Sequence, residues 1–501
     1  MTLTLDPTRI DLSVLRRLWQ GEACKLDGAS MDRIRASAAS VERIVAGGET
    51  VYGVNTGFGL LASTRIPAER LAELQRNLIL SHSCGLGDAL PRHVVRLMIV
   101  LKLLGLGRGY SGVRPLVIDA LQALLDLDAM PLIPAQGSVG ASGDLAPLAH
   151  LIAALMGEGR IDLAGDILPA ADALARLDMQ PLELGPKEGL ALINGTQAST
   201  AIALDALFMG ERVFGAALGA GALSVDALKG SVKPFDPRIS EVRGQPGQIK
   251  VAAEIRGLLE GSEILSSHGR CGKVQDPYSF RCQPQVMGAS LDLLTNAART
   301  LTIEAGAVTD NPIVFEDEDI AISGGNFHAQ PVAFAADTIA MALCEVGSLS
   351  ERRTAVLIDP KMSGLPAFLT DDGGVNSGLM IPQVTQAALV AENRSLAFPS
   401  SVDSVPTSAG QEDHVSMAPI SARKAASIAR NAAGIVAVEL IAAAQGIDYQ
   451  APLKTSAKLQ QLHVKIRSLS PRLESDRYWA NEMVALQAAV LAGGMGSLEL
   501  G

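Results

Sequence analysis

Long segments with apolar residues at helical spacing most constrain the fold of this chain. Residues 421–445 carry such residues three or four positions apart, namely Ile428, Ala432, Ile435, Val438 and Ile441. The segments 198–229, 336–357 and 480–492 are similar and are rich in alanine and leucine. Because 48% of residues are hydrophobic but only 3% are aromatic, the core must consist largely of small and aliphatic side chains. The sequence therefore predicts a mainly α fold containing a long-helix bundle.

Glycine-rich irregular segments interrupt these helical patterns, namely Val51–Thr64, Ser81–Leu90, Ala135–Leu148, Ser267–Gln285, Ile322–Pro331 and Pro399–Met417. We expect residues 1–205 to form a smaller, loop-rich region, and residues 206–501 to form the central and C-terminal bundle. Strand patterns are rare and short, with Ile161–Leu168 and Pro312–Phe315 as the candidates. A helical scaffold that presents polar loops is a common way to hold a functional site.

The charge balance argues against a nucleic-acid-binding surface, since the net charge is −11 and basic runs are absent. Residues 1–20 lack the continuous apolar stretch of a signal peptide. The long uncharged run 373–391 contains too many polar residues for a membrane span. Five cysteines without CxxC spacing indicate reduced thiols. These features predict a soluble cytoplasmic enzyme that binds neither membrane nor nucleic acid.

The tripeptide Ala141-Ser142-Gly143 has the composition needed to make an electrophile from its own backbone. If the Gly143 nitrogen meets the Ala141 carbonyl carbon, a five-membered ring closes. Loss of two waters, one of them the Ser142 hydroxyl, then leaves an exocyclic methylidene. Glycine offers an unhindered nitrogen and permits the dihedrals of a tight turn. The product would be 4-methylidene-imidazole-5-one (MIO).

The surrounding fourteen residues, Gly137 to His150, distinguish this tripeptide from an ordinary turn. A serine-hydrolase elbow is excluded, because Asp144 stands where Gly-x-Ser-x-Gly needs its second glycine. The stretch instead resembles the signature of the aromatic amino-acid ammonia-lyases and their aminomutase relatives. Further matching motifs, in order, are Val51–Gly59, Leu80–His82, Asn194–Gln197, Gln275–Gln285, Ser323–His328 and Gln411–Met417.

The resemblance implies a cofactor made autocatalytically from Ala141, Ser142 and Gly143, with no external cofactor. It implies that Tyr52 is the base that removes the β-proton, although a phenol with an ordinary pKa of about 10 needs a nearby positive charge for this. Arg281 would bind the substrate carboxylate bidentately. The resemblance gives the other roles as follows: Asn194 would contact the carboxylate or the electrophile, Tyr278 the amino group and the methylidene, and Phe327 a ring.

The positions that set substrate choice resemble the histidine ammonia-lyase branch of the family. They are His82, after Ser81, and the Gln411-Glu412 pair. A carboxylate such as Glu412 accepts an imidazole N–H and stabilises charge on the ring, while His82 bonds the other ring nitrogen. The implied reaction is deamination of L-histidine to trans-urocanate and ammonia, the first step of histidine degradation. By resemblance the enzyme is a homotetramer with shared active sites.

Several alternatives stay open from the sequence. The chain could be a tyrosine or phenylalanine ammonia-lyase, an MIO-dependent aminomutase, or a non-catalytic helical scaffold that kept the pattern. No metal is expected, since His268-x-x-Cys271 and His414 lack the three or four ligands of a zinc site. The chain departs from the family pattern at Gly306 and Gly410, where each glycine replaces a polar side chain near the predicted site.

Overall fold

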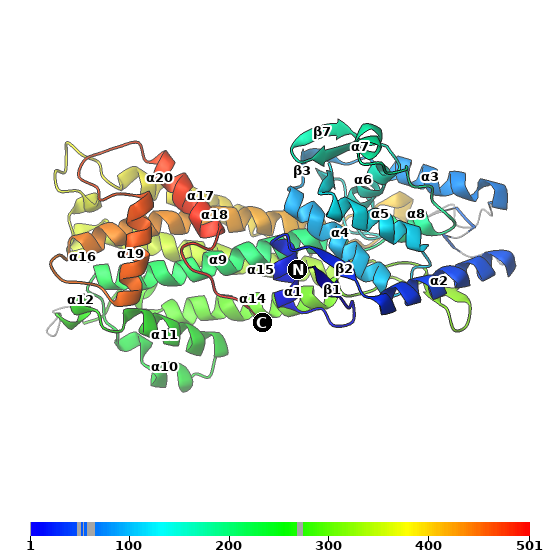
Figure 1. Cartoon of the computed structure of the whole chain (residues 1–501). Helices are drawn as coiled ribbons and strands as arrows, with labels where there is room; N and C mark the ends of the chain where they lie inside the picture. The colour runs from blue at the N-terminus through cyan, green and yellow to red at the C-terminus, as the bar shows by residue number, and fades with distance from the viewer. Residues whose placement is uncertain (1, 48–51, 54, 58–65, 268–273, 501) are drawn as a thin grey trace. The chain divides into compact units, whose positions relative to one another are not determined.

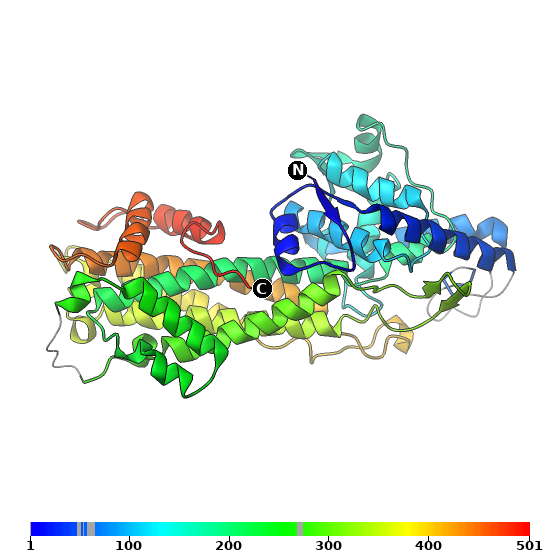
Figure 2. The same cartoon turned by 60° about the horizontal axis from the view of Figure 1, so that its bottom comes forward.

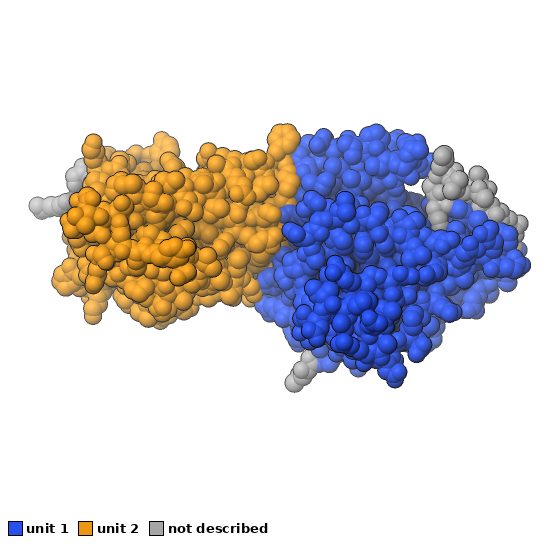
Figure 3. Space-filling model, turned by 90° about the horizontal axis from the view of Figure 1, so that it is seen from above, with its two compact units in different colours: residues 1–205, 298–336, 399–423 blue, residues 206–297, 337–398, 424–501 orange. Residues whose placement is uncertain are grey.

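The computed structural model describes residues 2–47, 52–53, 55–57, 66–267 and 274–500. These residues form twenty α-helices and nine short strands (Figures 1 and 2). The predicted mainly α fold is confirmed. Two compact units divide the chain (Figure 3): unit 1 comprises residues 1–205, 298–336 and 399–423, and unit 2 comprises 206–297, 337–398 and 424–501. The division of the chain into regions 1–205 and 206–501 stays a prediction.

Unit 1 combines eight helices with all the strands among the described residues. Its helices are α1 (Leu12–Trp19), α2 (Gly28–Gly47), α3 (Leu71–His82), α4 (Arg92–Gly107), α5 (Pro115–Asp126), α6 (Leu145–Leu155), α7 (Ala170–Arg176) and α8 (Glu188–Ile193), with 3₁₀ turns η2 (Ala68–Arg70) and η5 (Ser408–Gly410). Helices α4 and α6 are almost completely buried, which fits their nearly continuous apolar sequences.

The strands of unit 1 form four small sheets. They are β1 (Leu3–Leu5), β2 (Cys24–Leu26), β3 (Leu86–Ala89), β4 (Ala129–Pro131), β5 (Pro134–Gln136), β6 (Arg160–Leu163), β7 (Asp166–Pro169), β8 (Ile313–Phe315) and β9 (Ile320–Ile322). β1 pairs with β2 in parallel, whereas β3–β5, β4–β6–β7 and β8–β9 are antiparallel. The candidate strand Ile161–Leu168 is a hairpin, because Ala164 and Gly165 turn the chain with φ of 54° and 100°.

Four long helices contribute residues to both units: α9 (Gln197–Ala227), α14 (Gln283–Ala305), α15 (Gln330–Leu357) and α18 (Ala418–Asp448). They account for three of the four segments with helical spacing, and α20 (Ala480–Leu491) accounts for the fourth. Within the described chain, α15 and α18 are long and apolar enough to cross a membrane. Their apolar windows are 67% and 78% buried, as in the core helices of a folded bundle.

Unit 2 packs its parts of these helices side by side (Figures 1 and 2). A side chain at Gly221 of α9 would place Cβ 2.1 Å from Oε1 of Gln283 in α14, so glycine permits this close approach. The fully buried Arg353 of α15 donates to both carboxylate oxygens of Glu439 in α18, and Ser224 of α9 donates to Oε1 of that carboxylate. One buried ion pair and one hydrogen bond thus connect three helices.

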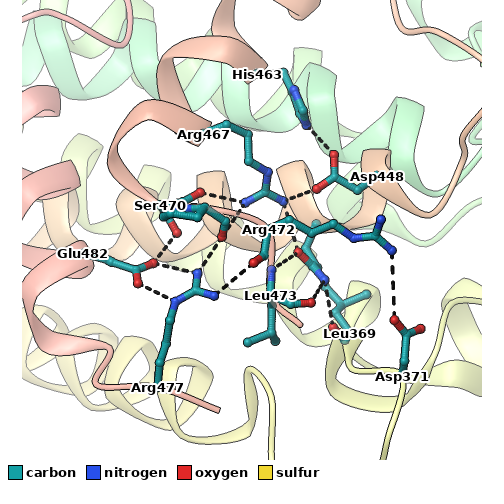
Figure 4. A network of polar contacts seen from close by, with 12 residues as sticks. Leu369, Asp371, Asp448, His463, Arg467, Ser470, Arg472, Leu473, Arg477 and Glu482 are labelled. Carbon is teal, nitrogen blue, oxygen red and sulfur yellow. Dashed lines mark hydrogen bonds and ion pairs between the residues drawn. The ribbon is translucent and has the colours of Figure 1, made fainter. Parts of the chain in front are cut away.

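The remaining elements of unit 2 are short apart from α11, α17 and α19. They are η3 (Lys233–Phe235), α10 (Pro237–Glu241), α11 (Pro246–Leu259), α12 (Glu263–Ser266), α13 (Tyr278–Arg281), α16 (Pro360–Ser363), η4 (Ala367–Leu369), α17 (Met380–Leu396), α19 (Ala457–Leu469) and α20. A polar network holds the C-terminal helices together (Figure 4). Arg467 of α19 donates to Asp448 at the end of α18, and Arg477 donates to Glu482 of α20.

Candidate active site

The Ala-Ser-Gly tripeptide lies in the loop between β5 and α6, against the backbone that connects α8 to α9. Gly143 has a φ of 81°, and a Cβ at this position would lie 2.3 Å from the carbonyl oxygen of Gly195. The Asp144 N–H donates to the same oxygen at 2.7 Å. Only glycine fits between these two backbone segments. The loop is thus held in a tight turn by its contact with Gly195.

Both oxygens of Ser142 have a polar partner. Its hydroxyl donates to Oε1 of Glu412 at 2.6 Å, and its carbonyl oxygen accepts from Nδ2 of Asn194 at 2.9 Å. The second carboxylate oxygen of Glu412 accepts from the Thr407 hydroxyl at 2.6 Å. The backbones of Thr407 and Glu412 also bond each other, which closes the short loop that carries the carboxylate.

A cavity of about 1140 Å³ opens over this tripeptide, and all its lining residues belong to unit 1. Eight of the predicted site residues line it: Tyr52, His82, Ala141, Ser142, Asn194, Phe327, Gln411 and Glu412. They come from segments far apart in the sequence. The volume suffices for a small-molecule substrate.

His82, the last residue of α3, has a defined ring orientation. Its Nδ1 lies 2.8 Å from the Leu78 carbonyl oxygen, which only accepts, so Nδ1 carries a proton. In the neutral ring Nε2 is therefore an acceptor. Burial lowers the pKa of His82, while the Leu78 carbonyl and the charge of Glu412 oppose that shift. The lowered pKa favours the neutral form.

Two buried ionisable groups lie behind the tripeptide. Lys102 of α4, only 2% exposed, donates to the backbone carbonyl of Asn194 at 2.7 Å. Burial lowers the pKa of Lys102 to about 7. Asp144 accepts from the backbone N–H and the hydroxyl of Ser199, and burial raises its pKa to about 6 despite these bonds. The electrostatic environment of the tripeptide is therefore set from within the core.

Three predicted residues do not line the cavity: Gly143, which lies against Gly195, and Tyr278 and Arg281, which belong to α13 in unit 2. Tyr278 is 71% exposed, and the guanidinium of Arg281 lies 4.5 Å from the centre of its ring. Nε of Arg281 has no hydrogen-bond partner in the described part of the chain.

The chain is similar to known proteins over nearly its whole length. Residues 10–468 match the family described as aromatic amino acid lyase. The chain belongs to this family. It is 58% identical over 487 residues to a histidine ammonia-lyase from Paracidovorax citrulli (strain AAC00-1), covering 97% of this chain and 95% of that protein. The predicted family membership and the prediction of a carbon–nitrogen lyase are both confirmed.

Solved structures of family members share the fold. The crystal structure of histidine ammonia-lyase from Trypanosoma cruzi is 39% identical, with a TM-score of 0.92 over 99% of this chain and 94% of that one. A tyrosine aminomutase from Streptomyces globisporus is 34% identical, with a TM-score of 0.94 over 99% and 98% of the two chains. The fold thus carries more than one reaction.

Sequence reasoning missed two residues that support the candidate site. Lys102 is a lone charge within the apolar run 97–106, and a charge there is a signal of a buried functional partner. Thr407 gives no signal, because only the fold brings its hydroxyl to Glu412. Within the described ranges no three His, Cys, Asp or Glu residues cluster as for a metal. His268 and Cys271 lie outside those ranges.

Proposed function

We propose that this chain is a histidine ammonia-lyase that converts L-histidine to trans-urocanate and ammonia. One observation carries the proposal: Glu412 and His82 line the same cavity as Ser142, and the Glu412 carboxylate contacts the Ser142 hydroxyl directly. The group that we assign to the imidazole thus lies beside the residue expected to become the electrophile. The named relatives from Paracidovorax citrulli and Trypanosoma cruzi support this choice.

The residues around Ser142 fit an MIO group made from Ala141, Ser142 and Gly143. The backbone of Gly195 leaves no room for a side chain at position 143, which keeps its nitrogen unhindered. The Ser142 carbonyl, which the ring retains, already has the Asn194 amide as donor. Once formed, the group supplies an electrophilic carbon that activates the amino group of the substrate for departure. Asn194 would keep its donation to this carbonyl and would withdraw electron density from the group.

The imidazole of the substrate is assigned to Glu412 and His82. The Glu412 carboxylate is an acceptor, and Nε2 of neutral His82 is an acceptor because Nδ1 donates to Leu78. Two acceptors match the two N–H groups of a positively charged imidazolium. Phenylalanine offers neither donor and would leave Oε1 of Glu412 and Nε2 of His82 without a partner from the substrate. Sites of this type reject an analogue that lacks the polar group by roughly 10⁴–10⁵-fold.

The other roles follow the family pattern. Tyr52 lines the cavity and would remove the β-proton, while Phe327 and Gln411 would pack beside the substrate. Arg281 would bind the carboxylate, with Tyr278 beside it. We propose that a homotetramer in the cytoplasm brings Tyr278 and Arg281 of one subunit to the cavity of another. Sedimentation of a fully active monomer would refute the shared site.

The test is replacement of Ser142 by alanine, followed by measurement of urocanate through its ultraviolet absorbance. Loss of deamination with retained helical content is expected, and undiminished deamination would end the proposal. Glu412→Ala should lower histidine turnover far more than it lowers stability. An intact mass short by two waters in the unaltered protein would establish the ring.

A second candidate is suggested by the fold match to a tyrosine aminomutase. An aminomutase returns ammonia to the β-carbon, so its product keeps nitrogen. Chromatography of the products from histidine, tyrosine and phenylalanine separates the two functions. Formation of a β-amino acid as the major product would favour the aminomutase.

A further inference from the structure

We propose that Glu412 is also the catalytic residue that removes the hydroxyl of Ser142 as water when the chain converts its own backbone into the electrophile. This inference rests on the proposed function, since it concerns the formation of the group which that function needs. The starting observation is the 2.6 Å hydrogen bond from the Ser142 hydroxyl to Oε1 of Glu412. The acid is thus in contact with the leaving group before any substrate is present.

The chemistry of the dehydration requires a proton carrier at this position. Ring closure forms the bond between the Gly143 nitrogen and the Ala141 carbonyl carbon. The Ala141 oxygen then leaves as water, taking the Gly143 and Ser142 amide protons. A second water takes the Ser142 Oγ, its own proton and the Ser142 Cα proton, and the Cα=Cβ bond forms. Hydroxide is a poor leaving group, so Oγ must receive a proton as the C–O bond breaks.

Glu412 is suited to carry that proton. Its carboxylate takes up the Cα proton, which is attached two bonds from Oγ, and delivers it to the departing oxygen. The residue returns to its starting state and no further reactant is needed. The hydroxyl of Thr407 bonds Oε2 and the paired backbones of Thr407 and Glu412 fix the loop, so that Oε1 stays directed at Ser142.

Further contacts fix the positions of Ser142 and Gly143, the residues that react. Asn194 bonds the Ser142 carbonyl, and Lys102 bonds the Asn194 backbone from the core. Gly143 is held against Gly195. The Ser142 side chain faces the cavity, where Glu412 contacts its hydroxyl.

Glu412 would have two roles, one after the other. Before dehydration, Oε1 is occupied by the Ser142 hydroxyl. Departure of that hydroxyl removes the donor and frees Oε1 for an imidazole N–H. The same carboxylate thus first completes the electrophile and then binds the substrate ring.

The test is the intact mass of freshly purified Glu412→Gln, in which the amide keeps the shape of the carboxylate and loses its proton-carrying capacity. The unaltered protein is expected to be two waters short of the translated mass. Glu412→Gln is expected to be at full mass or one water short, with fragmentation locating an intact hydroxyl at Ser142. Any later loss of that hydroxyl should be slower by about 10²-fold or more.

The matched control is Asp413→Asn, which removes a carboxylate of the same cavity one position away. It should be two waters short, like the unaltered protein. If Glu412→Gln does not fold, Glu412→Asp replaces it. This variant keeps the negative charge but moves the carboxylate away from Ser142 by one methylene, so an intact Ser142 hydroxyl is again expected. A two-water deficit in the folded Glu412 variant, equal to that of the unaltered protein, overturns this inference alone. Full mass in the unaltered protein overturns the proposed function as well.

Discussion

Nδ2 of Asn194 donates a hydrogen bond to the carbonyl oxygen of Ser142 at 2.9 Å, and the two residues lie 52 positions apart in the sequence. Asn194 is the C-cap that follows α8, and its own backbone carbonyl accepts from the buried Lys102. Lys102 therefore supports this contact from the protein core. Asn194 and Ser142 both line the cavity on the other side.

Replacement of Asn194 by alanine should lower kcat strongly, because the Ser142 carbonyl then loses its side-chain donor at the conjugated system. Loss of a single donor of this kind costs roughly 10²–10³-fold in kcat. Steady-state kinetics with histidine measures the effect. An intact mass measured in parallel shows whether the electrophile still forms. A change confined to KM would contradict the assigned role.

Lys102 should make stability depend on pH in the alkaline range. Its pKa is about 7 in the folded chain, against an ordinary value of 10.5. Between these values the unfolded chain holds a proton that the folded chain has released. The free energy of unfolding therefore rises from pH 7 to 10.5, by an amount on the order of 5 kcal/mol for the whole interval.

The variant Lys102→Met should remove this pH-dependent contribution. It is also expected to be less stable overall, because the Asn194 carbonyl loses its donor, so the slope against pH is the informative quantity. Urea unfolding at several pH values measures it. The exposed Lys458→Met serves as control and should keep the slope of the unaltered protein. Equal slopes for Lys102→Met and the unaltered protein would show that Lys102 keeps its ordinary pKa.

Gly143→Ala should prevent the tripeptide from adopting its turn. The new Cβ would lie 2.3 Å from the carbonyl oxygen of Gly195, at a φ of 81° that side chains rarely adopt. Gly159→Ala is a matched control, because its φ is 80° and no atom lies within 4 Å of the added Cβ. Both variants bear the backbone strain, but only Gly143→Ala adds the clash. Activity and a two-water mass deficit should survive in Gly159→Ala alone.

The sequence indicated much of this site because its chemistry depends on local motifs. Ala141-Ser142-Gly143 needs its three residue types side by side, and the helical spacing around Ile435 follows from local geometry. The supporting contacts depend instead on the fold. Nothing near Thr407 in the sequence announces Glu412 as its partner, since Ser408, Ala409 and Gly410 must all take positive φ to close that loop.

The structure gives a physical reason for the glycine at position 410, where the sequence departs from the family pattern. From the sequence, the resemblance implies only that a polar side chain is missing here. The structure shows a φ of 84° at this position, next to two residues with φ of 52° and 54°. Glycine adopts this conformation at no steric cost, so it eases the turn that presents Glu412.

The buried pair of Arg353 and Glu439 should govern the stability of the helical bundle in unit 2. Both side chains are fully buried, and Nη2 of Arg353 donates to Oε2 of Glu439 at 2.7 Å. Glu439→Ala leaves a guanidinium without its counter-charge and also removes the acceptor of Ser224. Breaking a buried pair in this way costs about 3–5 kcal/mol of unfolding free energy.

The double variant Arg353→Met with Glu439→Leu should recover most of that loss, because apolar side chains of similar volume carry no desolvation penalty. Urea unfolding followed by far-ultraviolet circular dichroism measures both variants. Asp32→Ala is the control: it breaks the exposed ion pair with Arg35 and should shift the transition little. If the double variant were as unstable as Glu439→Ala, the cost would lie in packing and in the lost Ser224 contact, and not in an uncompensated charge.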